Sequence, residues 1–594
     1  MNFKKITKKM KKFLLFIILL ALFAGCENDL EKEPPFISES QIFEQEPLTE
    51  AYISDLYTRM NFQELGGLAH LGMGLFSAVG AEHVNFANWQ YPNGAYRRQY
   101  TAITGPGNLD RWAYVNIREM NVLIEQLPNS SSLSQEYINS RVAEVRFLRA
   151  YEYFEMVRRF GGVPIITKVL SQDDPEEEIF PDRNTEKEVY DFIYSELNEI
   201  LPAFSDAKTG AAGRVDRYTV LMLQSRAMLY AASIANFGNG PEIEGLVGIS
   251  SGDAMTYYQR SYDASKAIVD SGQFSLVNDI SDKVENYKSI FLNEGNDEVI
   301  FAEVFDPEIR GHSFELLATP QGFKSTWNAN FPVLYDFVEL FDFTDGRTGM
   351  IPRNQLTADN RWDISDFFGN RDPRFRASVF YPEVPLQGSK VYFHTSTIYD
   401  DNGTMVESSN TNELLTRPDG EQWPAAAPPR NVRNTALLLS KRFDESNQNP
   451  ELGRSGQDFY LFRYAETLLN MAEASLYLGT GEALDALNEI RERAGMPLRT
   501  EATEENIRHE RQIELCFEEH RFWDLIRWRA ADGILNGEIK KGLVFKYYLD
   551  TNQYSITLKN GEQQERQFGP ERYYLPFPQG RLADNPNLIQ NPGY

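Results

Sequence analysis

The sequence predicts a mainly α-helical fold built from antiparallel helix pairs. Apolar residues recur at helical spacing over several long segments. Small residues, such as Ala465 and Ala472, stand at helical spacing between leucines. Small side chains let paired helices approach closely, as in tetratricopeptide-type repeats. The segments also follow one another as predicted hairpins: 108–127 with 136–160, 185–201 with 215–236, and 457–478 with 481–494.

The first residues read as a lipoprotein signal peptide over 1–25. Six lysines precede an apolar run from Phe13 to Ala24. At about 1.5 Å per residue this run reaches roughly 18 Å as a helix, short of the ~30 Å membrane core, which favours a secretory signal. Leu22-Phe-Ala-Gly25 before Cys26 is similar to the bacterial lipobox, which implies a lipidated Cys26. The alternative is an ordinary signal peptide with an incidental cysteine. Residues 26–42 then suit a lipidated tether.

Helix boundaries are marked by caps and breakers. Thr185-x-x-Glu188 fits a capping box, and Pro202 stops the helix that follows. Pro128 ends the segment 108–127, and glycines with Pro164 end 136–160. Further helices are expected at 256–271 and 504–529, the second of which would place His509 and His520 on one face.

The character of the sequence changes along the chain. We expect a helical N-terminal region over 43–300 and a C-terminal region over 301–594. The second region divides into a loop-rich part, 301–456, a helical part, 457–530, and a proline-rich tail, 571–594, which we expect to be extended. Long loops on a rigid scaffold are where binding usually occurs.

Composition excludes several classes of function. The net charge of −27 argues against a nucleic-acid partner and against a polybasic contact with anionic lipid. The only other cysteine, Cys516, has no partner for a disulfide and reads as a small buried apolar residue. Six histidines and the lack of HExxH or CxxC patterns predict no metal site and no cofactor.

Several blocks in order resemble the SusD/RagB family of Bacteroidetes outer-membrane lipoproteins. The most specific is DFYLFRYAETLLNMAEAS at 458–475, followed by a charged segment from Glu510 to Trp528. Together the blocks span nearly the whole chain after the signal. They lie at 144–150 with 160–164, 371–374, 458–475, 486–495, 510–528 and 576–594.

The resemblance implies a fold and a function. The fold would be four tetratricopeptide-like helix pairs in a superhelix, with an irregular region that carries the ligand site. The protein would be a lipid-anchored outer-membrane protein that faces the cell exterior. It would bind glycan, or peptide in some members, and act as a lid on a SusC-like TonB-dependent transporter.

The charged segment does not predict catalysis. Its acids and arginines stand three and four residues apart, which favours ion pairs within and between packed helices over an acid–base pair. We find no nucleophile elbow and no phosphate-binding glycine loop. We therefore expect no catalytic residue. The residues expected to form these ion pairs are Glu510, Arg511, Glu514, Glu518, Arg521 and Asp524.

A sugar site needs aromatic rings beside hydrogen-bonding groups, because a pyranose has apolar faces and a rim of hydroxyls. Two clusters have this composition, at 85–98 and 327–331. The alternative is that their tryptophans pack on the scaffold, as we expect for the helical Trp112, Trp523 and Trp528. The predicted ligand-binding residues are Asn88, Trp89, Tyr91, Asn93, Tyr96, Arg97, Trp327 and Asn328.

The sequence therefore predicts a non-enzymatic surface lipoprotein that captures oligosaccharide or polysaccharide for import. Two alternatives remain at this point. One is a peptide-binding member of the same family. The other is a surface glycoside hydrolase that uses a pair of carboxylates.

Overall fold

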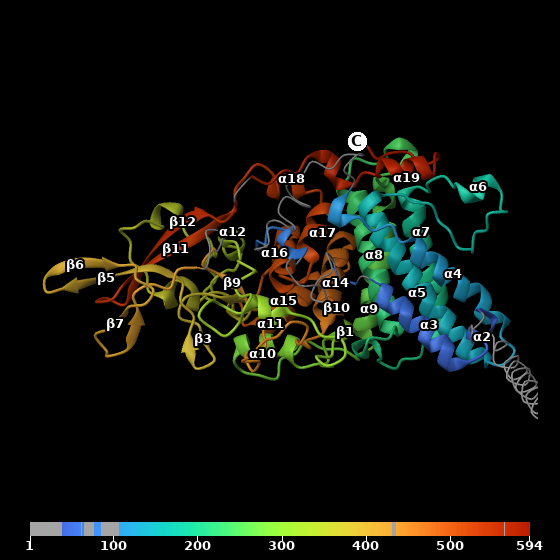
Figure 1. The fold of residues 1–594 in the computed structure, drawn as a ribbon. Helices are drawn as coiled ribbons and strands as arrows, with labels where there is room; N and C mark the ends of the chain where they lie inside the picture. The colour runs from blue at the N-terminus through green and yellow to red at the C-terminus, as the bar shows by residue number, and fades with distance from the viewer. Residues whose placement is uncertain (1–38, 61, 64–75, 85–105, 430–434, 563–564) are drawn as a thin grey trace, which may run out of the picture.

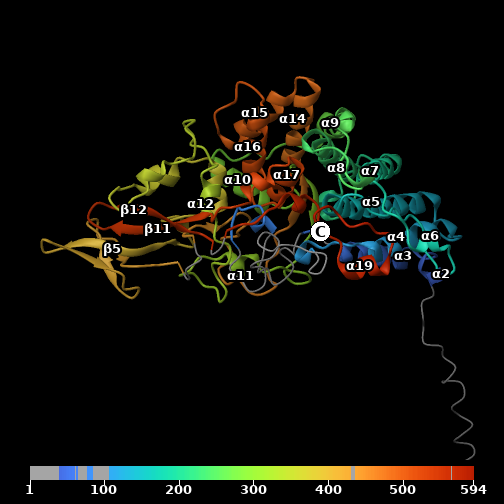
Figure 2. The ribbon, with the colours of Figure 1, turned by 90° about the horizontal axis from the view of Figure 1, so that it is seen from above.

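A computed structural model describes residues 39–60, 62–63, 76–84, 106–429, 435–562 and 565–594. Figures 1 and 2 show an elongated molecule with long helices at one end and strands at the other. Within the described residues, no helix has the length and apolar character needed to cross a membrane. The longer helices are α3 (Glu46–Arg59), α4 (Tyr114–Gln126), α5 (Gln135–Phe160), α7 (Glu186–Ile200), α8 (Arg217–Phe237), α9 (Ala254–Asp270), α10 (Lys283–Leu292), α14 (Tyr464–Leu478), α15 (Ala483–Ala494), α16 (Glu504–Glu514) and α17 (His520–Arg527).

The mainly helical fold and its paired helices are confirmed. In each predicted hairpin the two helices pack against each other: α4 with α5, α7 with α8, and α14 with α15. Helix α9 packs on both α8 and α14, so it joins the N-terminal pairs to the C-terminal pair. The small residues Ala465 and Ala472 are fully buried on α14. The shorter helices are α2 (Glu39–Ile42), α6 (Glu176–Ile179), α11 (Phe314–Ala318), α12 (Tyr335–Val338), α13 (Pro373–Ser378), α18 (Ala531–Ile534) and α19 (Gln579–Asp584).

Local signals set the helix ends. The capping box at α7 forms as predicted: the Thr185 hydroxyl accepts from the Glu188 N–H, and the Glu188 carboxylate accepts from the Thr185 N–H. At the end of α5, Gly161 takes a φ of 71°, where a side chain would be strained and would also meet the carbonyl oxygen of Leu246. The chain therefore turns sharply after Phe160.

Two predicted helices are wrong in part. The segment 457–478 begins as a strand, β10, and becomes helical only at Tyr464. The segment 504–529 is two helices, α16 and α17, because Phe517 and Glu519 take φ values of 59° and 68°. His509 and His520 therefore do not share one helical face.

The tail also differs from the expected extended chain. Residues 579–584 form α19, with Pro578 just before its first residue, a position that proline tolerates because no intrahelical N–H is needed there. The rest of the tail packs on the body of the protein. The Leu575 N–H donates to the carbonyl of Arg159, and the Asn591 side chain donates to that of Phe160.

The strands form a region that the sequence did not predict. A four-stranded sheet has the order β12-β11-β5-β6, and its β11–β5 pairing is parallel. Smaller two-stranded pairs are β1 with β10, β2 with β9, β3 with β4, and β7 with β8. The strands are β1 (Val299–Glu303), β2 (Val379–Phe380), β3 (Pro385–Leu386), β4 (Ser389–Lys390), β5 (His394–Asp401), β6 (Thr404–Ser408), β7 (Leu414–Thr416), β8 (Gln422–Pro424), β9 (Leu438–Leu439), β10 (Phe459–Arg463), β11 (Lys541–Tyr548) and β12 (Gln553–Asn560).

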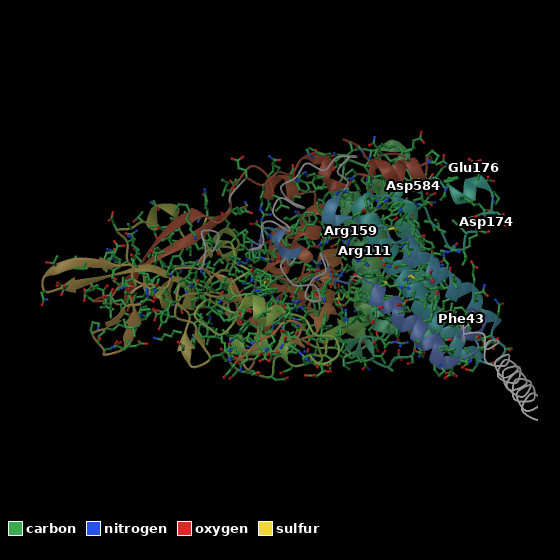
Figure 3. All side chains as sticks on the ribbon, in the orientation of Figure 1. Phe43, Arg111, Arg159, Asp174, Glu176 and Asp584 are labelled. Carbon is green, nitrogen blue, oxygen red and sulfur yellow. The ribbon has the colours of Figure 1, made fainter. Side chains whose placement is uncertain are left out.

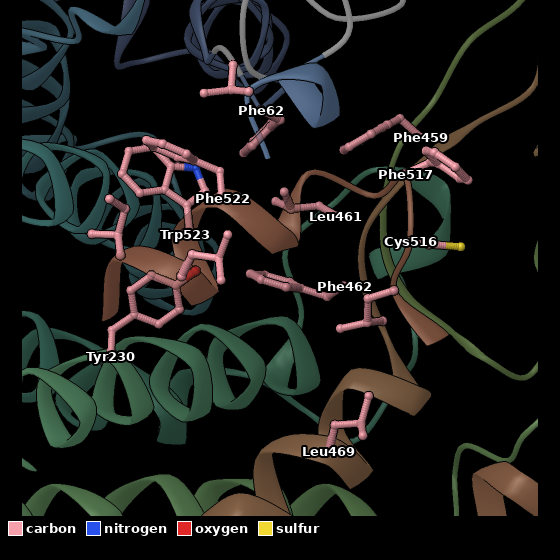
Figure 4. Close-up of a cluster of buried hydrophobic side chains, with 14 of the residues drawn as sticks. Phe62, Tyr230, Phe459, Leu461, Phe462, Leu469, Cys516, Phe517, Phe522 and Trp523 are labelled. Carbon is pink, nitrogen blue, oxygen red and sulfur yellow. The ribbon is translucent and has the colours of Figure 1, made fainter. Parts of the chain in front are cut away.

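Aromatic side chains from distant segments meet in the core between the helices and the strands (Figure 4). Phe62 packs edge-on against Phe301, with ring centroids 5.4 Å apart. Trp523 lies under the Arg158 guanidinium, 4.1 Å from the ring centroid. Cys516 is fully buried, as predicted, and burial raises the pKa of its thiol to about 12.

Buried ion pairs cross this core. Arg463, at the end of β10, contacts Glu298 at 2.6 Å and both Glu514 and Glu518 at 2.7 Å. All four side chains are almost completely buried. Because Glu298 precedes β1 and Glu514 ends α16, one guanidinium links three parts of the chain.

A second group of ion pairs lies within the helical end of the molecule. The Glu155 carboxylate accepts from Arg158 at 2.6 Å and from Arg159 at 2.7 Å. Arg111, from the loop before α4, approaches the same carboxylate at 3.4 Å. Figure 3 labels Arg111 and Arg159 in the helical part of the molecule. Burial alone would raise the pKa of Glu155, but the three guanidinium groups outweigh it and lower this pKa to about 2. This carboxylate therefore ties α5 to the segment before α4.

Replacing Arg463 by alanine is expected to destabilise the protein strongly, because three buried carboxylates lose a shared counter-charge. The expected cost is about 3–5 kcal/mol in the free energy of unfolding, measured by urea denaturation. The matched control is Arg59→Ala, which breaks an exposed pair with Asp55 at 2.6 Å and is expected to cost less than about 1 kcal/mol. Equal effects of the two substitutions would contradict the role given to Arg463.

Candidate ligand-binding site

The segment 319–331 forms an anchored loop after α11. The N–H of Ala329 donates to the carbonyl of Thr319 at 2.9 Å, and that of Asn330 to Leu317 at 3.0 Å. Ala329 takes a φ of 60°, which reverses the chain at this point. Phe331 then stacks on Phe314, with centroids 5.8 Å apart and ring planes 12° from parallel. The loop is therefore held at both ends by the body of the protein.

Trp327 stands at the exposed part of this loop. Its side chain is 44% exposed, whereas Asn328 is only 9% exposed. The Asn330 side chain donates to the Trp327 carbonyl at 2.5 Å, which fixes the backbone that carries the indole. On the other side of the tryptophan, Lys324 is hydrogen-bonded to Asn449. The arrangement presents an aromatic ring to solvent on a backbone that hydrogen bonds hold in place.

The first predicted cluster lies outside the described residues, and with it Asn88, Trp89, Tyr91, Asn93, Tyr96 and Arg97. The residues that lead into it are described. The N–H of Val84 donates to the carbonyl of Pro332 at 2.8 Å, and that of Leu334 donates to Glu82 at 3.0 Å. Val84, the last described residue before this cluster, therefore lies beside the segment that follows Trp327.

Of the three tryptophans predicted to lie in the helical core, two are buried there and Trp112 is not. Trp523 and Trp528 are 3% and 4% exposed. The prediction that Trp112 is a core residue on a helix is wrong. Helix α4 begins only at Tyr114, and Trp112 lies partly buried in the loop before it. Its ring lies under the Arg581 guanidinium at 4.4 Å and borders a surface groove of about 520 Å³.

The charged C-terminal helices hold ion pairs, as predicted. Arg374 contacts Glu510 at 2.6 Å and Glu514 at 2.9 Å, and Arg511 contacts Asp524 at 2.8 Å. Burial alone would raise the pKa of Glu510, but the neighbouring arginines outweigh it and lower this pKa. Glu510 therefore stays ionised at neutral pH and engaged with arginine.

Within the described residues, no group of three or more His, Cys, Asp and Glu side chains is placed to hold a metal ion.

Sequence reasoning missed the carboxyl group behind the loop. Glu315, on α11, is fully buried, and burial raises its pKa to about 7. Its carboxylate accepts from the N–H of Asp444 at 3.4 Å, and its carbonyl accepts from the N–H of Thr319 at 3.0 Å. The contact between residues 315 and 444 spans too much chain for any local pattern to reveal it.

Comparison with known proteins places the chain among related sequences and folds. The model of the SusD family matches residues 297–594. A model described as starch-binding associating with outer membrane matches residues 37–217. A SusD-like protein of Formosa agariphila is 22% identical over 91% of this chain and 98% of that protein. The starch-binding protein SusD of Bacteroides thetaiotaomicron is 24% identical over 85% of this chain and 83% of its own length.

Solved structures share the fold. The crystal structure of a SusD-like protein from Bacteroides fragilis has a TM-score of 0.69 at 23% identity, and covers 94% of this chain and 99% of that one. A laminarin-binding SusD-like protein has a TM-score of 0.56 at 20% identity, over 93% of this chain and all of that one.

Because Glu315 is buried with a raised pKa, the free energy of unfolding of the protein is expected to depend on pH. Its pKa in the folded protein, about 7, lies above the unfolded value near 4.5, so the folded state holds the proton more tightly. The stabilising contribution of this carboxyl is complete below about pH 4.5 and is lost as the pH rises through 7. Glu315→Gln, which cannot ionise, is therefore expected to be more stable than wild type at pH 8.

The measurement is urea unfolding at pH 5 and pH 8, with Glu285→Gln as a control on the exposed side of α10. The advantage of Glu315→Gln is expected to grow between the two pH values. An advantage that is the same at both would show that the carboxyl does not titrate as described.

Proposed function

Because this chain belongs to the SusD family, we propose that it is a surface glycan-binding protein that captures oligosaccharide or polysaccharide for import. It hands the glycan to a SusC-like TonB-dependent transporter in the outer membrane. The observation that carries the proposal is Trp327, an exposed indole on an anchored loop. The names of relatives support the ligand class, since one is starch-binding and another is laminarin-binding.

Trp327 has the chemistry that a sugar requires. The face of the indole offers dispersion and weak C–H contacts to the apolar face of a pyranose. Because hydrogen bonds already fix the backbone of the loop, binding costs little additional order there. Asn328 and the cluster Asn88, Trp89, Tyr91, Asn93, Tyr96 and Arg97 complete the proposed site with hydrogen-bonding groups and further rings.

In the proposed function, the protein binds its ligand and changes no covalent bond in it. A glycoside hydrolase of the usual kind needs two carboxyl groups free to exchange protons across a sugar. Glu510, Glu514 and Asp524 in these helices, and Glu518 between them, are instead buried against arginines. The arginines hold Glu510 and Glu518 ionised. These acids therefore have a role in stabilising the fold, which supports a binding protein over an enzyme.

The proposed location is the outer membrane, with the protein facing outward. Cys26 would carry the lipid, and residues 26–42 would form the tether to the folded body. With a net charge of −27, the protein is also a poor match for acidic glycans, because the surrounding potential repels them. A neutral glycan is therefore the proposed ligand.

Trp327→Ala is expected to weaken binding of a neutral oligosaccharide by about tenfold, which is about 1.4 kcal/mol, because the stacking surface is lost. Isothermal titration with maltoheptaose, laminariheptaose and other neutral oligosaccharides measures the effect. The matched control is Met405→Ala, which removes a side chain that is 61% exposed on β6 and is expected to leave the affinity unchanged.

Unchanged affinity of Trp327→Ala for a sugar that the wild type binds would remove Trp327 from the site. Binding of oligopeptides and of no sugar would favour a peptide-binding member of the family. Release of reducing ends by the pure protein would favour a hydrolase.

Cys26→Ser is expected to move the protein from the outer-membrane fraction to the soluble fraction, because the lipid cannot be attached. Cell fractionation with surface proteolysis of intact cells measures this. The wild-type protein, extracted with detergent, is expected to co-purify with a large β-barrel protein. A wild-type protein that stays soluble and alone would contradict the anchor and the transporter role.

A further inference from the structure

A cavity of about 710 Å³ lies away from the Trp327 loop. It lies where four segments meet: the turn after α8, the chain after α17, residues 570–574, and residues 592–593. Figure 1 shows α18, which begins beside this cavity, near the top of the molecule and α11 near the bottom. Its volume is within the range of about 300–1,000 Å³ that is typical of small-molecule sites.

Two tyrosines and one arginine form the centre of the cavity wall. The Arg529 guanidinium lies 4.8 Å from the ring centroid of Tyr573 and 5.0 Å from that of Tyr574. It donates to the Tyr574 hydroxyl at 2.6 Å and to the carbonyl of Ile526 at 3.1 Å. Arg529 takes a φ of 53°, so the chain turns at this residue as it leaves α17. The cation is thus held against two partly exposed rings.

Hydrogen bonds fix both rings. The Tyr573 hydroxyl donates to Asp532 at 2.7 Å. The Tyr574 hydroxyl donates to the buried Glu186 at 2.7 Å and accepts from the N–H of Gly248 at 3.1 Å. Two hydroxyl groups on adjacent residues are therefore anchored to two different parts of the protein, which fixes the orientation of both rings.

The opposite wall is backbone with little side-chain bulk. A Cβ added to Gly248 would lie 2.1 Å from the carbonyl oxygen of Gly240, so only glycine permits this close approach. Gly240 itself has a φ of 90° and open space where a side chain would be. The main chain of this turn can therefore meet a ligand directly.

The charges around the cavity select among ligands. Asp532, Glu242 and Glu571 line it together with the single cation Arg529. Three carboxylates against one guanidinium disfavour an anion, and an apolar ligand would cover these charges without hydrogen bonds. A neutral molecule with an apolar face and many hydroxyls satisfies both the rings and the charged groups.

We propose that this cavity is a second saccharide site, which binds a neutral sugar residue against Tyr573 and Tyr574. The choice of a saccharide as ligand rests on the proposed function. The location of the site rests on the cavity itself. In this arrangement Arg529 and the turn at Gly240 donate hydrogen bonds to sugar hydroxyls, and Asp532 accepts them. A protein with two separate sites can hold one long glycan, or two chains, on different faces.

Hydrogen–deuterium exchange of the full chain, read peptide by peptide, tests the two sites separately. The probes are millimolar maltoheptaose, laminariheptaose, cellohexaose, mannohexaose and xylohexaose, with hexagalacturonate as an anionic comparison. At least one neutral probe is expected to slow exchange in 237–248 and 569–575 by twofold or more, in wild type and in Trp327→Ala alike. Hexagalacturonate is expected to have no effect there.

Two variants locate the effect. Tyr573→Ala removes a ring, and Asp532→Asn changes an exposed acceptor without altering the core. Both are expected to abolish protection at the cavity while leaving protection at 319–331 in place. The matched control is Asp359→Asn, an exposed acid elsewhere, which is expected to change neither.

No protection at the cavity with any neutral probe would overturn the second site, as would protection that Trp327→Ala also removes. Protection there that survives both Tyr573→Ala and Asp532→Asn would overturn it as well. Failure of the proposed function would give a different result, namely no slowing of exchange at 319–331 with any probe. The two results are measured on different peptides of one sample.

Discussion

Buried pairing of arginine with carboxylate is the interaction on which the rest of the structure depends. Arg463 joins the β1–β10 pair to α16, and Arg374 joins α13 to the same helix. Further along, Arg226 of α8 contacts Glu466 of α14 at 2.5 Å, which connects the N-terminal helices to the C-terminal ones. Each charge is out of water, so its burial is tolerable only while its partner is in place. The packing of the two ends is therefore specified by charge as well as by apolar contact.

Both candidate sites are built on this frame rather than within it. The Trp327 loop is anchored to α11 and to the segment before residue 85, and the tyrosine cavity is anchored to Glu186 and to the chain after α17. In each case hydrogen bonds to the frame fix the backbone or the ring hydroxyl, and the aromatic side chain stays partly exposed. A rigid support with variable surface residues allows one fold to serve many ligands.

The sequence predicted what local signals determine. The capping box at Thr185 and the glycines after α5 marked helix ends correctly, because caps act within four residues. The parallel pairing of β11 with β5 joins residues about 150 apart, so no window of sequence contains it. The β5–β6 turn did carry a signal, since Asn402-Gly403 has positive φ at both residues, as a tight hairpin requires. Trp327 was singled out from the aromatic and amide residues around it and from the family resemblance, and its role in binding stays a prediction. The tyrosine cavity was missed because its walls come from four separate segments. The break between α16 and α17 was missed because Phe517 and Glu519 are residue types that usually avoid positive φ, so the sequence gives no sign of it.

The state of Cys516 bears on how the folded protein responds to oxidants. The thiol is buried beside Lys441, and with a pKa of about 12 it remains protonated at neutral pH. Only a thiolate attacks a disulfide or an oxidant at an appreciable rate. Once folded, the molecule has no reactive sulfur at this position, so an oxidising environment neither crosslinks it there to another protein nor damages it there.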